Sequence, residues 1–424
     1  MTPAPKRLRD RIPVVRRIPG VRRGVPRAIS DTPSTAIQLP SPLTRYARSP
    51  QRWRTGDVEV LRDGGQTYPA MLAALAGAQH RIDFETYILA ADRTGDRFKA
   101  VLLDRARAGV QVRIIYDAVG SFGLSDGWLD ELRAAGCQII DFNPIAPWRR
   151  RFRLSHRDHR KVIVVDDRVG FTGGLNIAND YASIEEGGVG WHDMHCRVTG
   201  AVVLDLARMF RRTWLRCGGK DYPPPTALSD GRSHHMPAPV IARPFIRLLD
   251  NTLRRQRTAM RRAYQHVIRA AKTSVVIQNA YFLPDRGIRR ALIRAAERGV
   301  DVRVMVPGHS DVKLVGFASL YILRRLATHG VKIFLWRGPM MHAKTAAVDG
   351  VWSTIGSYNF DAQSRFNNLE VTVEILDPAT ASVLAESFAR DVTNADPYDE
   401  QVWMRLSWWR KALAWVGYRL RRLL

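Results

Sequence analysis

The chain has 424 residues, 46% of them hydrophobic and 25% charged, a composition typical of globular proteins, and its length predicts two or three domains at about 150 residues each. No stretch reaches the roughly 18 consecutive apolar residues of a membrane-spanning helix, which excludes a protein that crosses the membrane several times. The formal net charge of +26 favours a polyanionic partner, either a membrane of acidic lipids or a nucleic acid.

Basic residues are concentrated at the two ends of the chain. Residues 1–54 contain 13 basic and 2 acidic residues together with many helix-breaking prolines, so we expect a disordered basic arm. Residues 218–245 include GGKDYPPPTALSDGR, whose turn-forming residues predict a linker. Residues 405–424 contain six basic residues and no acidic one. The strongest cationic surfaces are therefore predicted at the ends.

Around the linker, the chain repeats the pattern strand, helix, strand, helix, strand. Residues 82–142 hold the first copy and residues 276–336 the second, with Tyr87 and Tyr281 at matching positions. In each copy a glycine precedes the third strand, where it is expected to end a helix. Such βαβ units predict an α/β protein with two mixed sheets flanked by helices, in two lobes related by a pseudo-twofold axis. The predicted lobes span residues 55–217 and 246–396.

Each repeat then carries the same polar motif, HxKxxxxD, followed by a glycine-containing segment that ends in asparagine. The two sets stand at a single offset of 183 residues, which chance does not plausibly produce in register with a longer repeat. The residues are His159, Lys161, Asp166, Gly174 and Asn176 in the first copy, and His342, Lys344, Asp349, Ser357 and Asn359 in the second.

The periodicity of a strand predicts which of these residues lie together. A histidine and a lysine at positions i and i+2 point to the same face of a strand. Asp166 and Asp349 have the opposite parity and fall in turn sequences, so geometry alone predicts that they end strands or act indirectly. Asn176 and Asn359 lie on the next predicted strand, from which their amides can reach the face of the histidines.

Two histidines, two lysines and two amides that converge in this way suit a phosphodiester substrate. The lysines and amides can hold the non-bridging oxygens, a task that metal ions often perform in phosphoryl transfer. One neutral imidazole can attack phosphorus while the other, as imidazolium, protonates the leaving oxygen. Ammonium groups beside the imidazoles argue against a metal site, so neither a metal nor a cofactor is predicted.

Identical histidines need different environments to take opposite protonation states. Two carboxylates are candidates for this tuning: Asp193 follows His159 in WHDMHCRV, and Glu370 follows His342 in NNLEVTVEI. A carboxylate on the far nitrogen of each imidazole would orient the ring. The histidines on either side of Asp193 are expected to pack or to form local hydrogen bonds.

With these residues the chain resembles the phospholipase D superfamily, whose signature is HxKxxxxD followed by G(G/S)xN, in duplicate. Segments such as ARAGVQVRIIYDAVGS and HAKTAAVDGVWSTIGSYN are similar to the bacterial cardiolipin synthase branch, and the similarity spans roughly residues 56–395. The resemblance implies a duplicated phospholipase D-like fold and a metal-free transfer of a phosphatidyl group between phosphatidylglycerol molecules through a phosphohistidine. Many cardiolipin synthases begin with two membrane-spanning helices, and this chain is more similar to the shorter branch without them.

The resemblance also implies a role for each residue of the site. His159 is expected to be the nucleophile and His342 the general acid and base. Gly174 leaves the first lobe with one hydroxyl donor fewer than Ser357 gives the second. The implied phosphate-binding residues are Lys161, Lys344, Asn176 and Asn359, the implied orienting residues are Asp193 and Glu370, and Asp166 and Asp349 complete the catalytic signatures.

Residues 397–424 are expected to form a basic, tryptophan-rich amphipathic helix. Such helices lie at acidic membrane interfaces, although packing on the core of the enzyme is an alternative. We therefore expect a peripheral protein on the cytoplasmic face of the bacterial inner membrane, with acidic phospholipids, phosphatidylglycerol and cardiolipin, as its partner. At about 100° per residue, the expected apolar face consists of Leu406, Trp409, Leu413, Val416, Leu420 and Leu424.

The expected function is therefore a cardiolipin synthase-type phosphatidyltransferase. A phospholipase D-type lipid hydrolase is the alternative, because the sequence does not distinguish water from an alcohol as the acceptor. A nucleic-acid phosphodiesterase is less favoured, since the charge lies at the ends and the aromatic residues do not alternate with basic residues along one groove. Protein partners are not indicated.

Overall fold

The structure is a computed structural model. The predicted basic arm lies almost wholly outside the described residues, as do most of the predicted linker and the last four residues of the tail. The described residues are 37–38, 53–145, 155–225, 240–241, 244–253 and 256–420.

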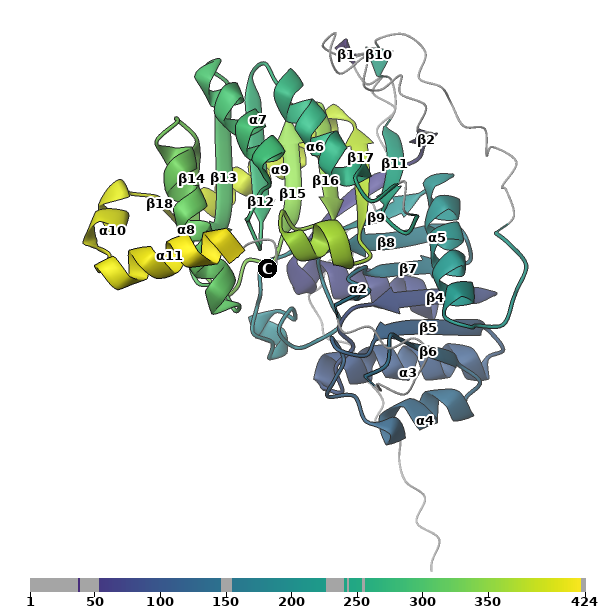
Figure 1. Cartoon of the computed structure of the whole chain (residues 1–424). Coiled ribbons are helices and arrows are strands. Elements are labelled where there is room, and N and C mark those ends of the chain that lie inside the picture. Colours follow the sequence, from purple (N-terminus) through teal and green to yellow (C-terminus); the bar gives the residue numbers. More distant parts are fainter. Residues whose placement is uncertain are drawn as a thin grey trace, which may run out of the picture. The chain divides into compact units, whose positions relative to one another are not determined.

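The first sheet is mixed, with one parallel block and one antiparallel block (Figure 1). Its last three strands run parallel to one another, and the other neighbours pair antiparallel. In order across the sheet, its described strands are β3 (Val58–Arg62), β9 (Met194–Thr199), β8 (Val169–Gly173), β7 (Val162–Val165), β4 (Arg81–Thr86), β5 (Gln111–Asp117) and β6 (Gln138–Phe142).

The second sheet has the same pattern and gains a strand at each edge. In order, its described strands are β2 (Arg54–Thr55), β11 (Phe245–Asp250), β17 (Val371–Leu376), β16 (Trp352–Gly356), β15 (Lys344–Val348), β12 (Ser274–Asn279), β13 (Asp301–Pro307), β14 (Lys332–Trp336) and β18 (Ala395–Pro397). A separate short antiparallel pair joins β1 (Ile37–Gln38) to β10 (Val240–Ile241).

The strand order from β3 to β6 in the first sheet is repeated from β11 to β14 in the second. Each sheet therefore contains the same four-strand antiparallel block followed by the same parallel block. The predicted fold class, a duplicated α/β fold with two mixed sheets flanked by helices, is confirmed. One detail differs from the predicted lobes: Thr55 opens the predicted first lobe, but β2 pairs with β11 in the second sheet.

The helices follow the same duplication. α5 packs on β7, β8 and β9 and also reaches β11, while α9 packs on β15 and β16 and also reaches β3. Each of these two helices thus contacts both sheets. The described helices are α2 (Asp63–Ala76), α3 (Arg93–Arg107), α4 (Asp126–Ala134), α5 (Val202–Arg216), α6 (Ala259–Ala270), α7 (Arg286–Glu297), α8 (Lys313–Ala327), α9 (Pro378–Val392), α10 (Glu400–Arg405) and α11 (Trp408–Leu420), with a 3-10 turn at Ile184–Glu186 and a π-helical turn at Gln363–Asn367.

Local sequence explains where equivalent helices begin and end. Asp92 caps α3 by accepting a hydrogen bond from a backbone N–H in its first turn, and Asp285 caps α7 in the same way. The predicted glycines that end helices are found in the left-handed region, with φ of 98° at Gly136 and 83° at Gly330. Each glycine lets the chain turn directly into the third parallel strand of its sheet.

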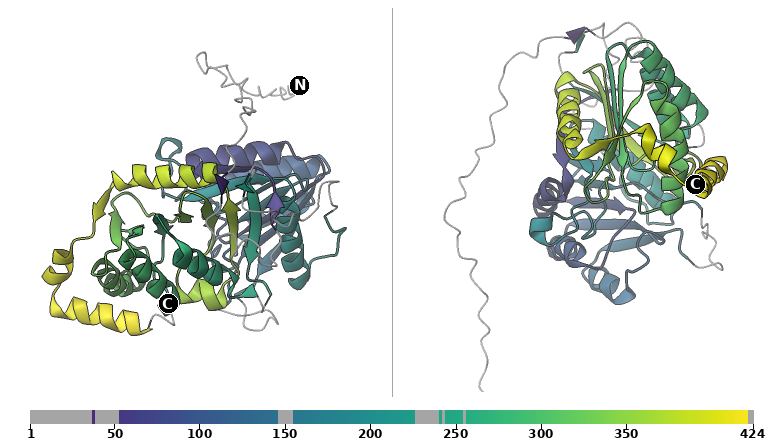
Figure 2. Two further views of the ribbon diagram at one scale, coloured as in Figure 1. Left: turned by 90° about the horizontal axis from the view of Figure 1, so that it is seen from above. Right: turned by 90° about the vertical axis from the view of Figure 1, so that its left-hand side faces the viewer.

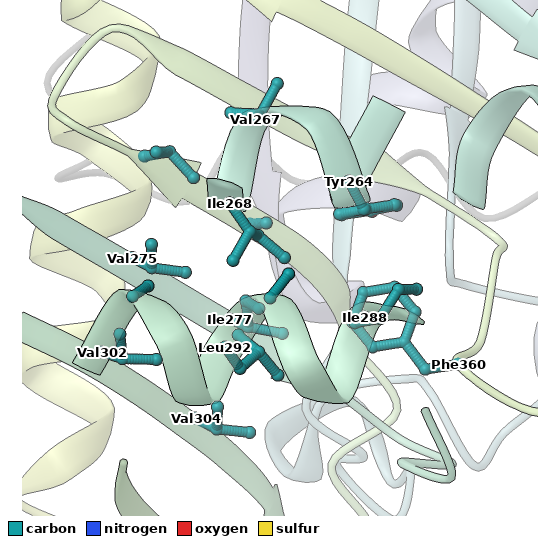
Figure 3. Close-up of a cluster of buried hydrophobic side chains, with 14 of the residues drawn as sticks. Tyr264, Val267, Ile268, Val275, Ile277, Ile288, Leu292, Val302, Val304 and Phe360 are labelled. Atoms are coloured by element: carbon teal, nitrogen blue, oxygen red, sulfur yellow. The ribbon is translucent and has the colours of Figure 1, made fainter. Parts of the chain in front are cut away.

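Apolar side chains fill each lobe and also the space between the sheets. Figure 3 shows part of the second-lobe core, where Ile288 and Leu292 of α7 pack over Ile277 and Val304 of the sheet. A different cluster contains residues of both lobes: its members include Val164, Met194 and Cys196 from the first sheet and Ile355, Val371 and Val373 from the second. The inner faces of the two sheets therefore share one core.

The predicted tail helix, 397–424, is divided in the structure, because a non-helical step separates α10 from α11. α11 packs against α8, and Figures 1 and 2 both place it beside that helix. The helices approach closely at Gly417, where an added Cβ would lie 3.2 Å from the Cβ of Ala318. The rings of Tyr418 and Tyr321 meet nearby, with centroids 4.6 Å apart and planes tilted by 33°.

The expected apolar face of the tail is not the face that packs on the protein. Trp409, Leu413 and Val416 remain exposed on α11, as do Trp408 and Trp415. The buried positions are instead small residues, because small side chains allow α11 to approach α8. None of the helices in the described part of the chain has the length and apolarity that a membrane crossing requires.

Candidate active site

The two polar motifs lie at matching places in the two sheets and meet at one centre. Lys161 directly precedes β7, with His159 two residues before it, and His342 lies two residues before Lys344, the first residue of β15. All four side chains are buried. The centroids of the two imidazole rings are 6.3 Å apart, so one phosphoryl group between them can contact both rings.

Each histidine is held by a carboxylate from the opposite lobe. His159 Nδ1 lies 3.2 Å from Glu370 Oε2, and His342 Nδ1 lies 2.7 Å from Asp193 Oδ2. Both orienting carboxylates named from the sequence are therefore at the site, but each acts across the lobes and not on the histidine that precedes it in the chain. With Nδ1 engaged as a donor, Nε2 of each ring carries the lone pair.

Backbone hydrogen bonds explain why the carboxylates cross over. The His159 N–H donates to Leu369 O at 3.0 Å, and the His342 N–H donates to His192 O at 2.7 Å. Leu369 immediately precedes Glu370, and His192 immediately precedes Asp193. The backbone of each motif histidine is thus hydrogen-bonded to a residue of the other lobe, and the residue that follows this partner in the sequence supplies the carboxylate.

The two carboxylates have different surroundings. The hydroxyls of Ser357 and Ser364 both donate to Glu370, the second at 2.7 Å. In the first lobe the position equivalent to Ser357 is Gly174, where an added Cβ would lie 2.1 Å from Asp193 Oδ1. The first lobe has no room for a serine here. Asp193 is the counterpart of Glu370, and its carboxylate, on a shorter side chain, occupies the space that a serine would need. This explains the departure at Gly174 that the sequence shows.

The two lysines are buried cations close to the same centre. Each ammonium group donates to the carbonyl oxygen of the histidine two residues earlier, at 2.7 Å for Lys161. Burial and the charge of Lys344 lower the pKa of Lys161 to about 7, and burial lowers the pKa of Lys344 to about 8. A bound phosphate would reverse these shifts, since it supplies the negative charge that the ammonium groups lack.

The imidazoles are also shifted toward their neutral forms. Burial and the neighbouring Lys161 lower the pKa of His159, and burial together with Lys344 lowers the pKa of His342 further. The pKa values of the two orienting carboxylates are shifted in opposite directions. Burial raises the pKa of Asp193, whereas the pKa of Glu370 is lowered because His159 and its hydrogen bonds outweigh burial. Glu370 is therefore the stronger partner for a positive charge on an imidazole.

The two asparagines are buried next to the motifs, but their contacts differ. Asn176 accepts a hydrogen bond from the Ile88 N–H at 3.1 Å and donates to the Tyr181 hydroxyl at 2.7 Å. The side-chain oxygen of Asn359 is buried with no protein partner among the described residues. This oxygen can therefore accept a hydrogen bond from a hydroxyl of a bound molecule.

The structure places Asp166 and Asp349 at the other end of the motif strands from the histidines. Both adopt left-handed backbone conformations, with φ of 51° and 52°. Asp166 accepts the backbone N–H groups of residues 79–81, and Asp349 accepts those of residues 272–274. These carboxylates fix the starts of β4 and β12, which agrees with the parity argument. A direct catalytic part for them has no support in this geometry.

Four aromatic residues surround the centre, and the sequence analysis assigned none of them to the site. The Tyr181 hydroxyl lies 3.3 Å from His342 Nδ1. Trp191 and Tyr281 lie beside His342, with ring centroids 6.1 and 6.2 Å away, and Tyr87 lies 5.0 Å from His159. The sequence could have indicated one pair as site residues, because Tyr87 and Tyr281 occupy matching positions of the repeat. Tyr181 and Trp191 have no such signal.

His192 is a buried cation that ties the lobes together next to Asp193. Its Nδ1 lies 2.6 Å from Asp63 Oδ1, and its Nε2 lies 3.0 Å from Asp391 Oδ2. Asp63 also accepts the Asp193 N–H at 2.9 Å. Although burial opposes charge, the hydrogen bonds with Asp391 and Asp63 raise the pKa of His192 to about 9. The hydrogen bonds expected for this histidine are therefore not local: its two partners are distant in the sequence and come from both lobes.

We expect the free energy of unfolding to depend on pH through His192. Its pKa of about 9 lies above the value of about 6.5 in an unfolded chain, so the ion pairs contribute fully below about pH 6.5 and are lost as the pH rises through 9. His192→Gln should lower the free energy of unfolding by roughly 3 kcal/mol at pH 6. Urea unfolding of both proteins from pH 6 to pH 10 measures this, and a difference that does not shrink with rising pH would contradict the assignment.

Solved structures show the same fold. A phosphatidylserine synthase of Haemophilus influenzae Rd KW20 matches 90% of this chain and 100% of its own, with a TM-score of 0.68 at 14% identity. A polyphosphate kinase of Porphyromonas gingivalis matches 81% of this chain and 49% of its own, with a TM-score of 0.54 at 13% identity. At these identities the likeness concerns the fold alone.

Sequence comparison identifies the family. The family model described as "Cardiolipin synthase, PLD-like domain" matches residues 71–214 and 264–392, one segment in each lobe. A cardiolipin synthase of Geobacillus thermodenitrificans is 35% identical over 346 residues, covering 80% of this chain and 67% of that protein. A probable cardiolipin synthase, YwiE, of Bacillus subtilis is 31% identical over 340 residues, covering 80% and 67%. The chain belongs to the cardiolipin synthase family of proteins with phospholipase D-like domains.

Proposed function

We propose that this chain moves a phosphatidyl group from one phosphatidylglycerol to a second one, forming cardiolipin and releasing glycerol. The observation that carries the proposal is the paired centre, in which two buried imidazoles 6.3 Å apart are each held at Nδ1 by a carboxylate of the other lobe. Family membership supports the class of reaction: the chain is a phosphatidyltransferase of the phospholipase D superfamily.

In the first step, the phosphate of the donor lies between the imidazoles, with its non-bridging oxygens on the ammonium groups of Lys161 and Lys344. The Nε2 lone pair of His159 attacks phosphorus, and the bond from phosphorus to the glycerol oxygen breaks. The imidazolium of His342 gives its Nε2 proton to that oxygen, so glycerol leaves neutral. We assign the attack to His159 because the ionised Glu370 beside it stabilises the positive charge that develops on the ring.

In the second step, the glycerol hydroxyl of another phosphatidylglycerol takes the place of the departed glycerol. His342 Nε2 accepts the hydroxyl proton while the oxygen attacks phosphorus, and the phosphorus–nitrogen bond to His159 breaks. His342 becomes an imidazolium again while the phosphate of the product is still bound. The negative phosphate is the group that restores its proton affinity, because in the empty site burial and the two lysines lower its pKa.

The outer surface of the C-terminal helix supports a peripheral location on an acidic membrane. Arg410 lies over the ring of Trp409 and Arg419 over the ring of Trp415, at 5.1 and 5.5 Å from the centroids. Exposed tryptophans next to guanidinium groups are typical of helices that lie in the headgroup region. We place the enzyme on the cytoplasmic face of the bacterial inner membrane, with the exposed face of α11 toward acidic lipids.

Incubation of the purified protein with labelled phosphatidylglycerol tests the function and the absence of a metal requirement together. We expect cardiolipin and glycerol in equal amounts, and we expect the rate to change less than about twofold with EDTA, because lysines and imidazolium supply the electrostatic stabilisation. Mass spectrometry of the lipids provides the measurement. Phosphatidic acid as the main product would make the enzyme a hydrolase, and a loss of rate that added divalent metal restores would refute the metal-free mechanism.

A further inference from the structure

A cavity lies beside the candidate active site in the second lobe, between α8 and the carboxyl ends of β12 and β13. Its volume is about 370 Å³, and neither catalytic motif contributes to its lining. Most of the wall is aliphatic or aromatic, with Phe282 from the end of β12, Leu335 from β14, and Val315, Leu320 and Leu323 from α8. The mechanism described above makes no use of this space.

One wall of the cavity is formed by the sequence neighbours of Tyr281, the residue whose ring lies beside His342. Ala280 and Phe282 line the cavity, and Tyr281 between them points the other way along the strand end. The ring centroid of Tyr281 is 6.2 Å from that of His342, and its hydroxyl donates to Asp311 at 2.7 Å. A molecule whose phosphate lies at His342 can therefore reach the cavity with a chain attached to the same phosphate.

Two hydroxyls and one backbone N–H in the wall already have hydrogen-bond partners within the protein. The Ser319 hydroxyl donates to Phe282 O at 3.3 Å, and the Ser310 hydroxyl donates to Val312 O at 3.1 Å. The Gly308 N–H donates to Trp336 O at 3.0 Å. A headgroup in this cavity would find few partners and would lose its hydration, whereas a hydrocarbon chain would lose nothing and bury apolar surface.

The geometry points to this cavity as the binding site for one acyl chain of the donor phospholipid. The inference rests on the proposed phosphatidyl transfer, because a phosphatidyl donor carries acyl chains within a glycerol unit of the phosphate that the histidines attack. The acyl chain of the donor leaves the lipid surface, passes Tyr281 and lies between α8 and the second sheet. Its burial gives the enzyme a preference for long-chain donors that does not depend on a membrane surface.

The test uses phosphatidylglycerols with acyl chains of four to eight carbons, each below the concentration at which it forms micelles. For the wild-type protein, kcat/KM should rise by about fourfold for each carbon added to the acyl chains. Leu320→Trp fills the cavity and should flatten this rise, so that the eight-carbon donor loses at least tenfold while the four-carbon donor changes less than twofold. Leu314→Trp is the matched control, because Leu314 is exposed on the same helix and does not line the cavity.

Each outcome bears on one of the two proposals. A wild-type protein that forms no cardiolipin from any donor would overturn the proposed function. A wild-type protein that forms cardiolipin, with equal chain-length dependence in Leu320→Trp and Leu314→Trp, would overturn the acyl site alone. If a thermal melt shows that Leu320→Trp does not fold, Leu320→Asn makes the wall polar without adding volume. The same flattened rise in that variant supports the site, and an unchanged rise overturns it.

Discussion

Replacing His159 by alanine should abolish turnover, by roughly 10⁴-fold or more, and should leave no covalent adduct on the protein. The reason is that Nε2 of this imidazole forms the bond to phosphorus in the proposed first step. Replacing His342 by alanine should also stop turnover, but a phosphatidyl group should accumulate on His159. With a donor whose leaving group needs no proton, such as a nitrophenyl ester, formation of that adduct should be nearly as fast as in the wild-type protein.

Intact-protein mass spectrometry after mixing with such a donor distinguishes the two histidines. His329→Ala is the control, because this histidine is exposed at the end of α8, and it should leave both turnover and the adduct unchanged. Finding the adduct on His342 in the His159 variant would reverse the assignment. The proposed preference for His159 would then need a cause other than the ionised Glu370.

The second large effect is expected at the surface of α11. Arg410→Gln with Arg419→Gln should weaken binding to phosphatidylglycerol vesicles by about 30-fold, since each cation near an acidic surface contributes about 1 kcal/mol. Added salt should weaken binding of the wild-type protein in the same direction, because it screens the same attraction. Sedimentation with vesicles measures both effects.

The matched control removes the same charge elsewhere. Arg105→Gln with Arg133→Gln changes two arginines on α3 and α4, and vesicle binding should change by less than twofold. Equal weakening in both double variants would show that net charge and not α11 attracts the membrane. Substitution is a better test than deletion of the tail, because α11 packs on α8 at Gly417, and its removal would uncover Ala318 and the surrounding apolar residues.

Much of the fold and the centre of the site could be predicted from the sequence because they are duplicated. A repeat at a fixed offset reveals the two histidines, the two lysines and the equivalent strands without any knowledge of packing. Parity along a strand also predicted the positions of Asp166 and Asp349 as structural carboxylates. The repeat could not show which lobe each orienting carboxylate serves, since the order of residues in the chain does not state which segments pair across two sheets.

Other features depend on close packing that residue type alone does not encode. The helical wheel of the tail identifies an apolar face, yet α11 approaches α8 through Ala414 and Gly417, because only small side chains permit that distance. Tyr181 reaches His342 from the other lobe by virtue of a loop conformation that leaves no periodic signal. The fit of Gly174 against Asp193 likewise depends on the length of a side chain that lies just before a neighbouring strand, β9.

The crossed pairing of histidines and carboxylates has a consequence for how small such an enzyme can be. A single repeat contains an imidazole and a lysine, but the group that fixes the tautomer of that imidazole belongs to the other repeat. A polypeptide with one repeat would therefore need a second copy of itself to complete either half of the centre. If the two lobes of this chain are produced as separate polypeptides, each should be inactive. Mixing them should restore both histidine–carboxylate pairs at once.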